Sequence, residues 1–197
     1  MSIRFYFIFL LSLIFLSVEA QEKNVVANGW TMKFGYSRIN SWPFRKGNIG
    51  DIRLEGNYGF LKYLEAGVYC GATLTKTSHD DGTGENYNNY PVLSYGINAN
   101  IQILPLVFKD KKTRFDLYTS VKVGGYYIFA PKGYYPDGGG LTTSVGGGLV
   151  YYPFKRLGIY SEYGYGFGEG VYRAINEYDY PHDKNVGSFR FGLTFRF

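Results

Sequence analysis

The chain has 197 residues, of which 21 are lysine or arginine and 16 are aspartate or glutamate, so the formal net charge at neutral pH is +5. Aromatic residues make up 20% of the sequence, charged residues only 19%, and there are 27 glycines. The single cysteine excludes an internal disulfide, and the basic charge comes with no recognised nucleic-acid-binding motif, so we expect no nucleic-acid partner.

The first 20 residues predict a cleaved secretory signal peptide. A short basic start precedes Phe5 to Leu16, 12 residues that are almost wholly apolar. Val18 and Ala20 then place small residues at the two critical positions of a cleavage site. So short an apolar stretch cannot cross about 30 Å of hydrocarbon as a helix, which argues against an uncleaved anchor. We therefore expect 1–20 to be removed and 21–197 to form one domain.

Apolar and polar residues alternate in about eight segments of the remaining chain. Successive side chains of a strand point to opposite faces, so each segment predicts a strand with one apolar and one polar face. No segment shows helical spacing as clearly. In chain order, the apolar faces run from Trp30 to Tyr36, Ile52 to Phe60, Leu64 to Leu74, Leu93 to Ile103, Phe115 to Tyr127, Leu141 to Tyr151, Leu157 to Phe167 and Phe189 to Phe197.

The connections between these segments alternate in length. Three are short, namely those around Leu61 and Lys62, from Pro105 to Thr113 and from Pro153 to Arg156. Four are longer and rich in turn-forming residues, namely Ser37 to Gly50, Ser78 to Tyr90, Ala130 to Gly140 and Gly168 to Asn185. An even strand number with short turns at one end and long loops at the other is typical of bacterial outer-membrane barrels.

Alternation alone allows either face to point inward, and a secreted lipocalin-like barrel would bury the apolar one. The polar face here is rich in glycine, serine and asparagine, which suits the tight interior of an eight-stranded barrel. Aromatic residues near the strand ends match the girdles of membrane barrels. We predict an all-β fold, an eight-stranded antiparallel transmembrane up-and-down barrel in a Gram-negative outer membrane. Both termini would be periplasmic and the long loops extracellular.

The glycine- and tyrosine-rich segment Tyr160 to Gly166 and the terminal segment Phe189 to Phe197 resemble small OmpA/OmpX-like outer-membrane β-barrel proteins, especially the Bacteroidota-type barrel domain. The resemblance covers the chain after the signal peptide and implies a membrane barrel without a cofactor. It also implies two partners, the outer-membrane lipids and the barrel-assembly machinery. That machinery would read the terminal aromatic residues Phe189, Phe191, Phe195 and Phe197.

Charged residues on the polar faces predict an ion-pair network inside the barrel, because an unpaired charge in a narrow lumen is costly. Eight strands enclose little more than their own side chains, which favours a plugged interior. The alternative is a narrow porin-like path for ions or small solutes. The predicted network consists of Lys33, Arg53, Glu55, Glu65, Asp116, Lys122, Glu162, Arg190 and Arg196.

Basic residues also gather in the short connections, whereas the long connections carry acidic ones. A basic rim at one end of a membrane barrel is expected to lie near anionic lipid headgroups. The residues of this predicted rim are Lys62, Lys109, Lys111, Lys112, Arg114, Lys155 and Arg156.

Hydrolysis or acyl transfer would need a nucleophile with a base in hydrogen-bond reach. The two histidines, His79 and His182, fall in expected loops, and no Gly-x-Ser-x-Gly motif occurs. Ser78 is next to His79, but adjacent side chains on an extended chain point apart. We therefore predict a non-enzymatic protein without catalytic, cofactor-binding or metal-binding residues, whose role is structural or a surface interaction.

Two loop features bear on partners. Residues Asp80 to Glu85 lack the alternating acidic spacing of an EF-hand calcium loop, so a solvated turn is the simpler interpretation. Tyr172, Tyr178 and Tyr180 in the last long connection supply large amphipathic side chains of the kind that recognition loops use. They would either contact an extracellular partner or pack on neighbouring loops.

Cys70 falls on an apolar face, where cysteine acts as a small hydrophobic residue.

Overall fold

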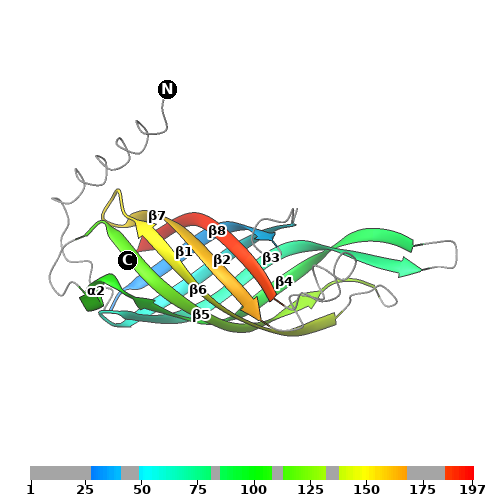
Figure 1. The fold of residues 1–197 in the computed structure, drawn as a ribbon, viewed down its shortest axis with the longest axis horizontal. Helices are drawn as coiled ribbons and strands as arrows, with labels where there is room; N and C mark the ends of the chain where they lie inside the picture. The colour runs from blue at the N-terminus through cyan, green and yellow to red at the C-terminus, as the bar shows by residue number, and fades with distance from the viewer. Residues whose placement is uncertain (1–27, 41–48, 81–84, 108–112, 132–137, 168–184) are drawn as a thin grey trace, which may run out of the picture.

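The computed structural model describes residues 28–40, 49–80, 85–107, 113–131, 138–167 and 185–197 (Figure 1). The predicted signal peptide, residues 1–20, lies outside the described residues. Eight strands and one short helix, α2 (Leu104–Val107), make up the described chain. The strands are β1 (Trp30–Asn40), β2 (Ile49–Leu61), β3 (Leu64–Asp80), β4 (Glu85–Gln102), β5 (Phe115–Ile128), β6 (Gly138–Tyr151), β7 (Leu157–Phe167) and β8 (Asn185–Arg196).

Each strand pairs antiparallel with its neighbours in the sequence, and β1 also pairs with β8, which closes the sheet into a barrel. The closing seam runs from Thr31 opposite Arg196 to Asn40 opposite Gly187 without an interruption in register. This arrangement confirms the predicted fold class, an eight-stranded antiparallel up-and-down barrel. None of the helices in the described residues is both long and apolar enough to cross a bilayer.

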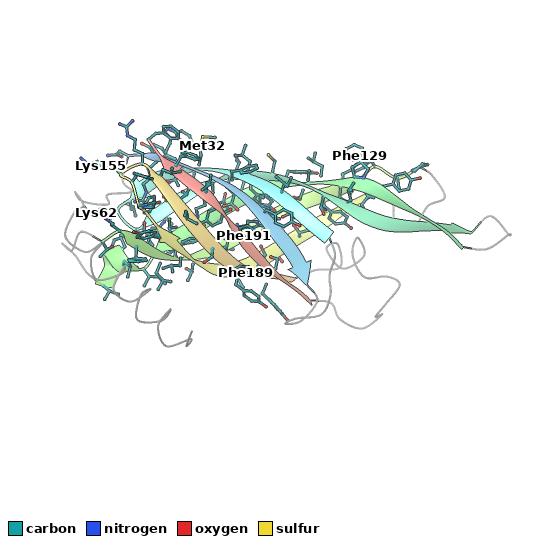
Figure 2. All side chains as sticks on the ribbon, turned by 90° about the horizontal axis from the view of Figure 1, so that it is seen from above. Met32, Lys62, Phe129, Lys155, Phe189 and Phe191 are labelled. Carbon is teal, nitrogen blue, oxygen red and sulfur yellow. The ribbon has the colours of Figure 1, made fainter. Side chains whose placement is uncertain are left out.

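The two faces of the barrel are inverted relative to a water-soluble protein, in which large apolar side chains are buried. Ile97 on the outer face is 65% exposed, whereas Glu65 on the inner face is 0% exposed. The outer face carries the predicted apolar side chains of every strand, and Figure 2 shows them projecting away from the ribbon. Charged and amide side chains fill the interior.

One predicted loop is wrong. The connection Ser78 to Tyr90 is largely strand, because β3 and β4 stay paired as far as Asp80 opposite Glu85. The pairing of β3 with β2 ends at Thr73, and that of β4 with β5 ends at Val92. The hairpin therefore extends past its neighbours as a two-stranded ribbon, seen projecting from the barrel in Figure 1. The sequence of this ribbon shows no alternation of apolar and polar residues, so it resembled a loop.

The ends of other expected connections are also strand. Ser37 belongs to β1, Ile49 already begins β2, and Gly138 begins β6, so the expected ranges Ser37 to Gly50 and Ala130 to Gly140 were too long. The β2–β3 turn consists of Lys62 and one further residue, and a register shift just before it accommodates the tight reversal. Longer strands make a taller barrel wall at the end opposite the short turns.

Glycines on the inner face make room for large side chains that point into the barrel. A Cβ atom at Gly158 would lie 2.8 Å from the ring of Tyr152 and 2.8 Å from the methyl group of Thr194. A Cβ atom at Gly35 would overlap the hydroxyl of Tyr160. Glycine at these positions is thus a packing requirement of the tyrosine-rich interior.

Candidate functional site: the barrel interior

All nine charged residues of the predicted network lie on the inner face of the barrel. Two of them, Arg53 and Arg196, keep some solvent access, with side chains 17% and 14% exposed. The other seven are buried, namely Lys33, Glu55, Glu65, Asp116, Lys122, Glu162 and Arg190. The period of two along each strand puts them there, because every one alternates with an outward apolar neighbour.

A central cluster joins four strands across the interior. Lys122 on β5 forms ion pairs with Glu55 on β2 and with Glu162 on β7, the latter at 2.7 Å. Arg190 on β8 contacts the same Glu162 carboxylate at 3.3 Å. Two strands separate β2 from β5, so the Lys122–Glu55 pair crosses the lumen and does not follow the wall. Side chains from opposite walls therefore meet in the middle of the barrel.

Tyrosines complete this cluster. Tyr118, fully buried on β5, donates a hydrogen bond of 2.9 Å from its hydroxyl to the second oxygen of Glu162. The Nζ atom of Lys33 lies 3.7 Å from the centroid of the Tyr118 ring and 5.8 Å from that of Tyr160. No hydrogen-bond acceptor lies within reach of this amine among the described residues. The Lys33 charge is thus held by aromatic faces, whose electrons attract a cation.

Asp51 belongs to the network although the sequence analysis did not include it. Its Oδ2 atom accepts hydrogen bonds from Arg190 at 2.9 Å and from the Ser37 hydroxyl at 3.1 Å. It also lies 3.5 Å from the guanidinium of Arg53. Asp51 was missed because it was placed next to a long loop. Extending the β2 alternation back by two residues from Arg53 would have put it on the inner face.

A second cluster lies nearer the short-turn end. Arg196 on β8 forms an ion pair across the interior with Asp116 on β5, and its guanidinium lies 4.4 Å from the centroid of the Tyr152 ring. Glu65 accepts hydrogen bonds from Thr31 at 2.9 Å and from Asn100 at 3.5 Å. No cation lies within ion-pairing distance of Glu65 in the described part of the chain.

The charges inside the barrel balance. With Asp51 added, the network has five acidic side chains, which equal its five basic ones. Because burial of a charge is costly unless an opposite charge or hydrogen bonds compensate it, this equality is what a closed interior requires. The arrangement stabilises a packed polar core. Histidine, cysteine, aspartate and glutamate do not come together in threes suitable for a metal ion anywhere in the segments described.

The remaining predicted residues lie elsewhere. Phe189, Phe191, Phe195 and Phe197 are exposed on the outer face, the first two of them labelled on β8 in Figure 2. The exposed thiol of Cys70 is also on that face. The predicted loop contacts Tyr172, Tyr178 and Tyr180 lie outside the described residues, as does His182. An assembly signal in the four phenylalanines stays a prediction.

Comparisons with known proteins show the fold. No family model matches the chain, and neither does any curated protein. The N-terminal β-barrel domain of Pseudomonas aeruginosa OprF is similar, with a TM-score of 0.53 and 12% identity over 87% of this chain and 98% of that domain. Neisserial surface protein A is similar with a TM-score of 0.51 and 13% identity, over 85% of this chain and 94% of its own. These neighbours are small outer-membrane β-barrels, and at such low identity the likeness extends to the fold alone.

Proposed function

We propose that this protein is a non-enzymatic integral barrel of a Gram-negative outer membrane, with a sealed interior and a structural or surface-contact role. The observation that carries the proposal is the inversion of its two faces, with apolar side chains outside and ion pairs inside. An exposed apolar surface that encircles a molecule is stable only against lipid, because in water it would associate with other copies.

The outer surface supports a membrane location in detail. Among the described side chains, only three charged ones are exposed, Lys62, Lys155 and Arg156, and all three lie in the short turns. The outward side chains that the structure describes on the strands belong to apolar or aromatic residues, glycine, serine or threonine. Aromatic pairs gather near both ends of the strands, for example Trp30 with Tyr58 at 5.2 Å. Aromatic girdles flank the apolar band of membrane barrels in the same way.

The filled lumen favours a sealed barrel over the narrow channel that the sequence also allowed. An ion crossing the barrel would have to displace the ion pairs of Lys122 with Glu55 and Glu162. In a low-dielectric interior, such separation of charges is expensive. Eight strands also leave no space beyond their own side chains.

The β3–β4 ribbon supports the surface-contact role. Its two strands, beyond Thr73 and Val92, pair with each other and with no other strand in the described chain. We place this ribbon and the long loops outside the cell and the short turns in the periplasm, which is the usual orientation of such barrels. A ribbon that stands clear of the membrane presents its paired strands to the exterior. We infer that an extracellular partner would contact this ribbon or the predicted loop residues Tyr172, Tyr178 and Tyr180.

Conductance across a planar bilayer tests the sealed interior. We expect refolded protein to insert, shown by heat-modifiable migration on a gel, without producing steady conductance steps, because ion pairs block the lumen. Reproducible unitary steps from several preparations would establish the channel instead. A processed protein that stayed monomeric in buffer without detergent would contradict the membrane location itself.

A further inference from the structure

We propose that the short-turn end of the barrel binds the anionic headgroups of phospholipids in the adjoining leaflet. The binding surface, called here the basic rim, comprises Lys62, Lys155 and Arg156 of the predicted rim with their neighbours Leu61, Tyr63 and Phe154. Of the other predicted residues, Arg114 is half-buried, and Lys109, Lys111 and Lys112 lie outside the described residues. The proposal rests on the membrane location proposed above. It adds a preference for one class of lipid and the residues that carry it.

Among the side chains that the structure describes, the exposed charged ones are all positive and all lie at this end. Lys62 is at the tip of the turn between β2 and β3, and Lys155 and Arg156 are in the connection between β6 and β7. Figure 2 shows Lys62 and Lys155 at the same end of the barrel. None of the acidic side chains that the structure describes is exposed beside them, so the described side chains of the rim carry only positive charge.

Short turns hold these cations close to the barrel wall. Leu61 pairs directly with Leu64, so the turn that carries Lys62 has little freedom to move away from the strands. In the other connection, the carbonyl of Arg156 accepts a hydrogen bond of 2.8 Å from the backbone amide of Arg196. Lys62 and Arg156 are thus kept at the level where the apolar band ends.

Apolar side chains stand among the cations. Phe154 is 65% exposed next to Lys155, and Leu61 and Tyr63 are exposed on either side of Lys62. Leu61 follows Phe60, which belongs to the outward apolar face of β2, so the rim continues the lipid-facing surface. A soluble acidic partner would gain nothing from this continuity. A lipid fits both parts, because its acyl chains meet the apolar residues and its phosphate meets the cations.

The expected preference follows from electrostatics near a charged surface. Each lysine or arginine close to an anionic membrane strengthens its attraction by about fivefold. Three such residues in one rim therefore predict a preference for anionic over zwitterionic lipid that is larger than the experimental error of a binding measurement. Because charges farther apart than about 10 Å are screened at 0.1 M salt, the preference must weaken as salt is added.

Trp30 is a built-in reporter of lipids at this end. Its carbonyl accepts a hydrogen bond of 2.9 Å from the amide of the terminal Phe197, and its ring is exposed on the outer face. The chain has two tryptophans, so Trp42→Phe leaves Trp30 as the sole one. This variant would be refolded into phosphatidylcholine vesicles that contain increasing fractions of brominated phosphatidylglycerol, with brominated phosphatidylcholine as the reference. Quenching of Trp30 then reports the relative affinity of the anionic lipid.

We expect the anionic lipid to bind beside Trp30 several-fold more strongly than phosphatidylcholine at low salt. Lys62→Gln, Lys155→Gln and Arg156→Gln together should lower this ratio several-fold. A matched control, Arg45→Gln, Lys46→Gln and Arg173→Gln, removes the same charge from the β1–β2 and β7–β8 connections and should leave the ratio unchanged.

Three results would overturn the preference: a ratio near one in the parent, no change in the rim variant, or an equal loss in both triple variants. Heat-modifiable migration in pure phosphatidylcholine vesicles is recorded for each protein. A failure of every protein to insert there would refute the membrane location. Insertion without an anionic preference would refute the rim proposal alone.

Discussion

At the scale of single residues, Lys122 shares with Arg190 the neutralisation of the central carboxylates. It forms ion pairs with carboxylates on two non-adjacent strands, Glu55 on β2 and Glu162 on β7, and is itself buried. By contrast, Arg53 lies at the edge of the network, where it contacts the Tyr69 ring and pairs with Asp51, which Arg190 also neutralises. Removal of a buried cation from this barrel therefore affects different numbers of carboxylates, depending on which cation is removed.

Lys122→Met should reduce the free energy of unfolding by about 3–5 kcal/mol, because the buried carboxylates of Glu55 and Glu162 must then share Arg190, which also pairs with Asp51. Arg53→Met is the matched control and should cost about 0–1 kcal/mol, since its side chain is partly exposed and Asp51 keeps Arg190. Urea titration of the protein in lipid vesicles measures both. Equal losses for the two variants would mean that the central ion pairs do not stabilise the barrel.

At the scale of strands, the pattern that matters is the alternation of glycine with large side chains across neighbouring strands. Gly158 on β7 faces the Tyr152 ring on the inner side, where the space is full. Gly56 on β2 has nothing within 4 Å of where its Cβ would lie. Glycine is thus required by the packing at position 158, whereas the space at position 56 would also admit a larger side chain.

Gly158→Ala should destabilise the barrel by about 1–3 kcal/mol, because the added methyl group overpacks the interior against Tyr152 and Thr194. Gly56→Ala should instead be neutral or stabilise by about 0.4–1 kcal/mol, since it only reduces the freedom of the unfolded chain. Unfolding in guanidinium chloride compares them with the parent. A loss of stability at Gly56 that matched the loss at Gly158 would contradict this account of inner-face packing.

At the scale of the whole molecule, the barrel is a polar core within an apolar surface, with a ribbon at one end and the basic rim at the other. The rim and the ribbon lie at opposite ends, as Figure 1 and Figure 2 both show for the β3–β4 hairpin and the short turns. The outer face between them is the part that must match the membrane. The loss in the free energy of unfolding caused by a substitution on this face depends on how deep in the membrane the residue lies, as well as on the new side chain.

Ile97→Arg tests that depth dependence. Ile97 pairs with Val68 midway along the barrel part of the β3–β4 pairing, so an arginine there should cost about 2–4 kcal/mol. Leu61→Arg, also outward but at the rim, should cost about 0–1 kcal/mol. The free energy of unfolding from phosphatidylcholine vesicles gives both values. If the two substitutions were tolerated equally, the outer face would not be in hydrocarbon.

Much of the interior was predictable because alternation is a local property. Lys33 and Glu55 lie on the inner face for the same reason that Phe34 and Leu54 lie on the outer one, and this reason can be read from neighbouring residues. The ribbon beyond Thr73 and Val92 was not predictable in this way. Its two strands pair only with each other in the part of the chain that the structure describes, and their sequence carries no apolar period, so no local pattern marks them as strands.

The sequence by itself determined the number of strands, the face on which each side chain lies and the near equality of charge inside. It could not determine which charges meet. The contacts of Lys122 with Glu55, of Arg196 with Asp116 and of Lys33 with Tyr118 join strands that are not neighbours. They depend on the closure of β1 on β8 and on the register of every strand between, which no local pattern specifies.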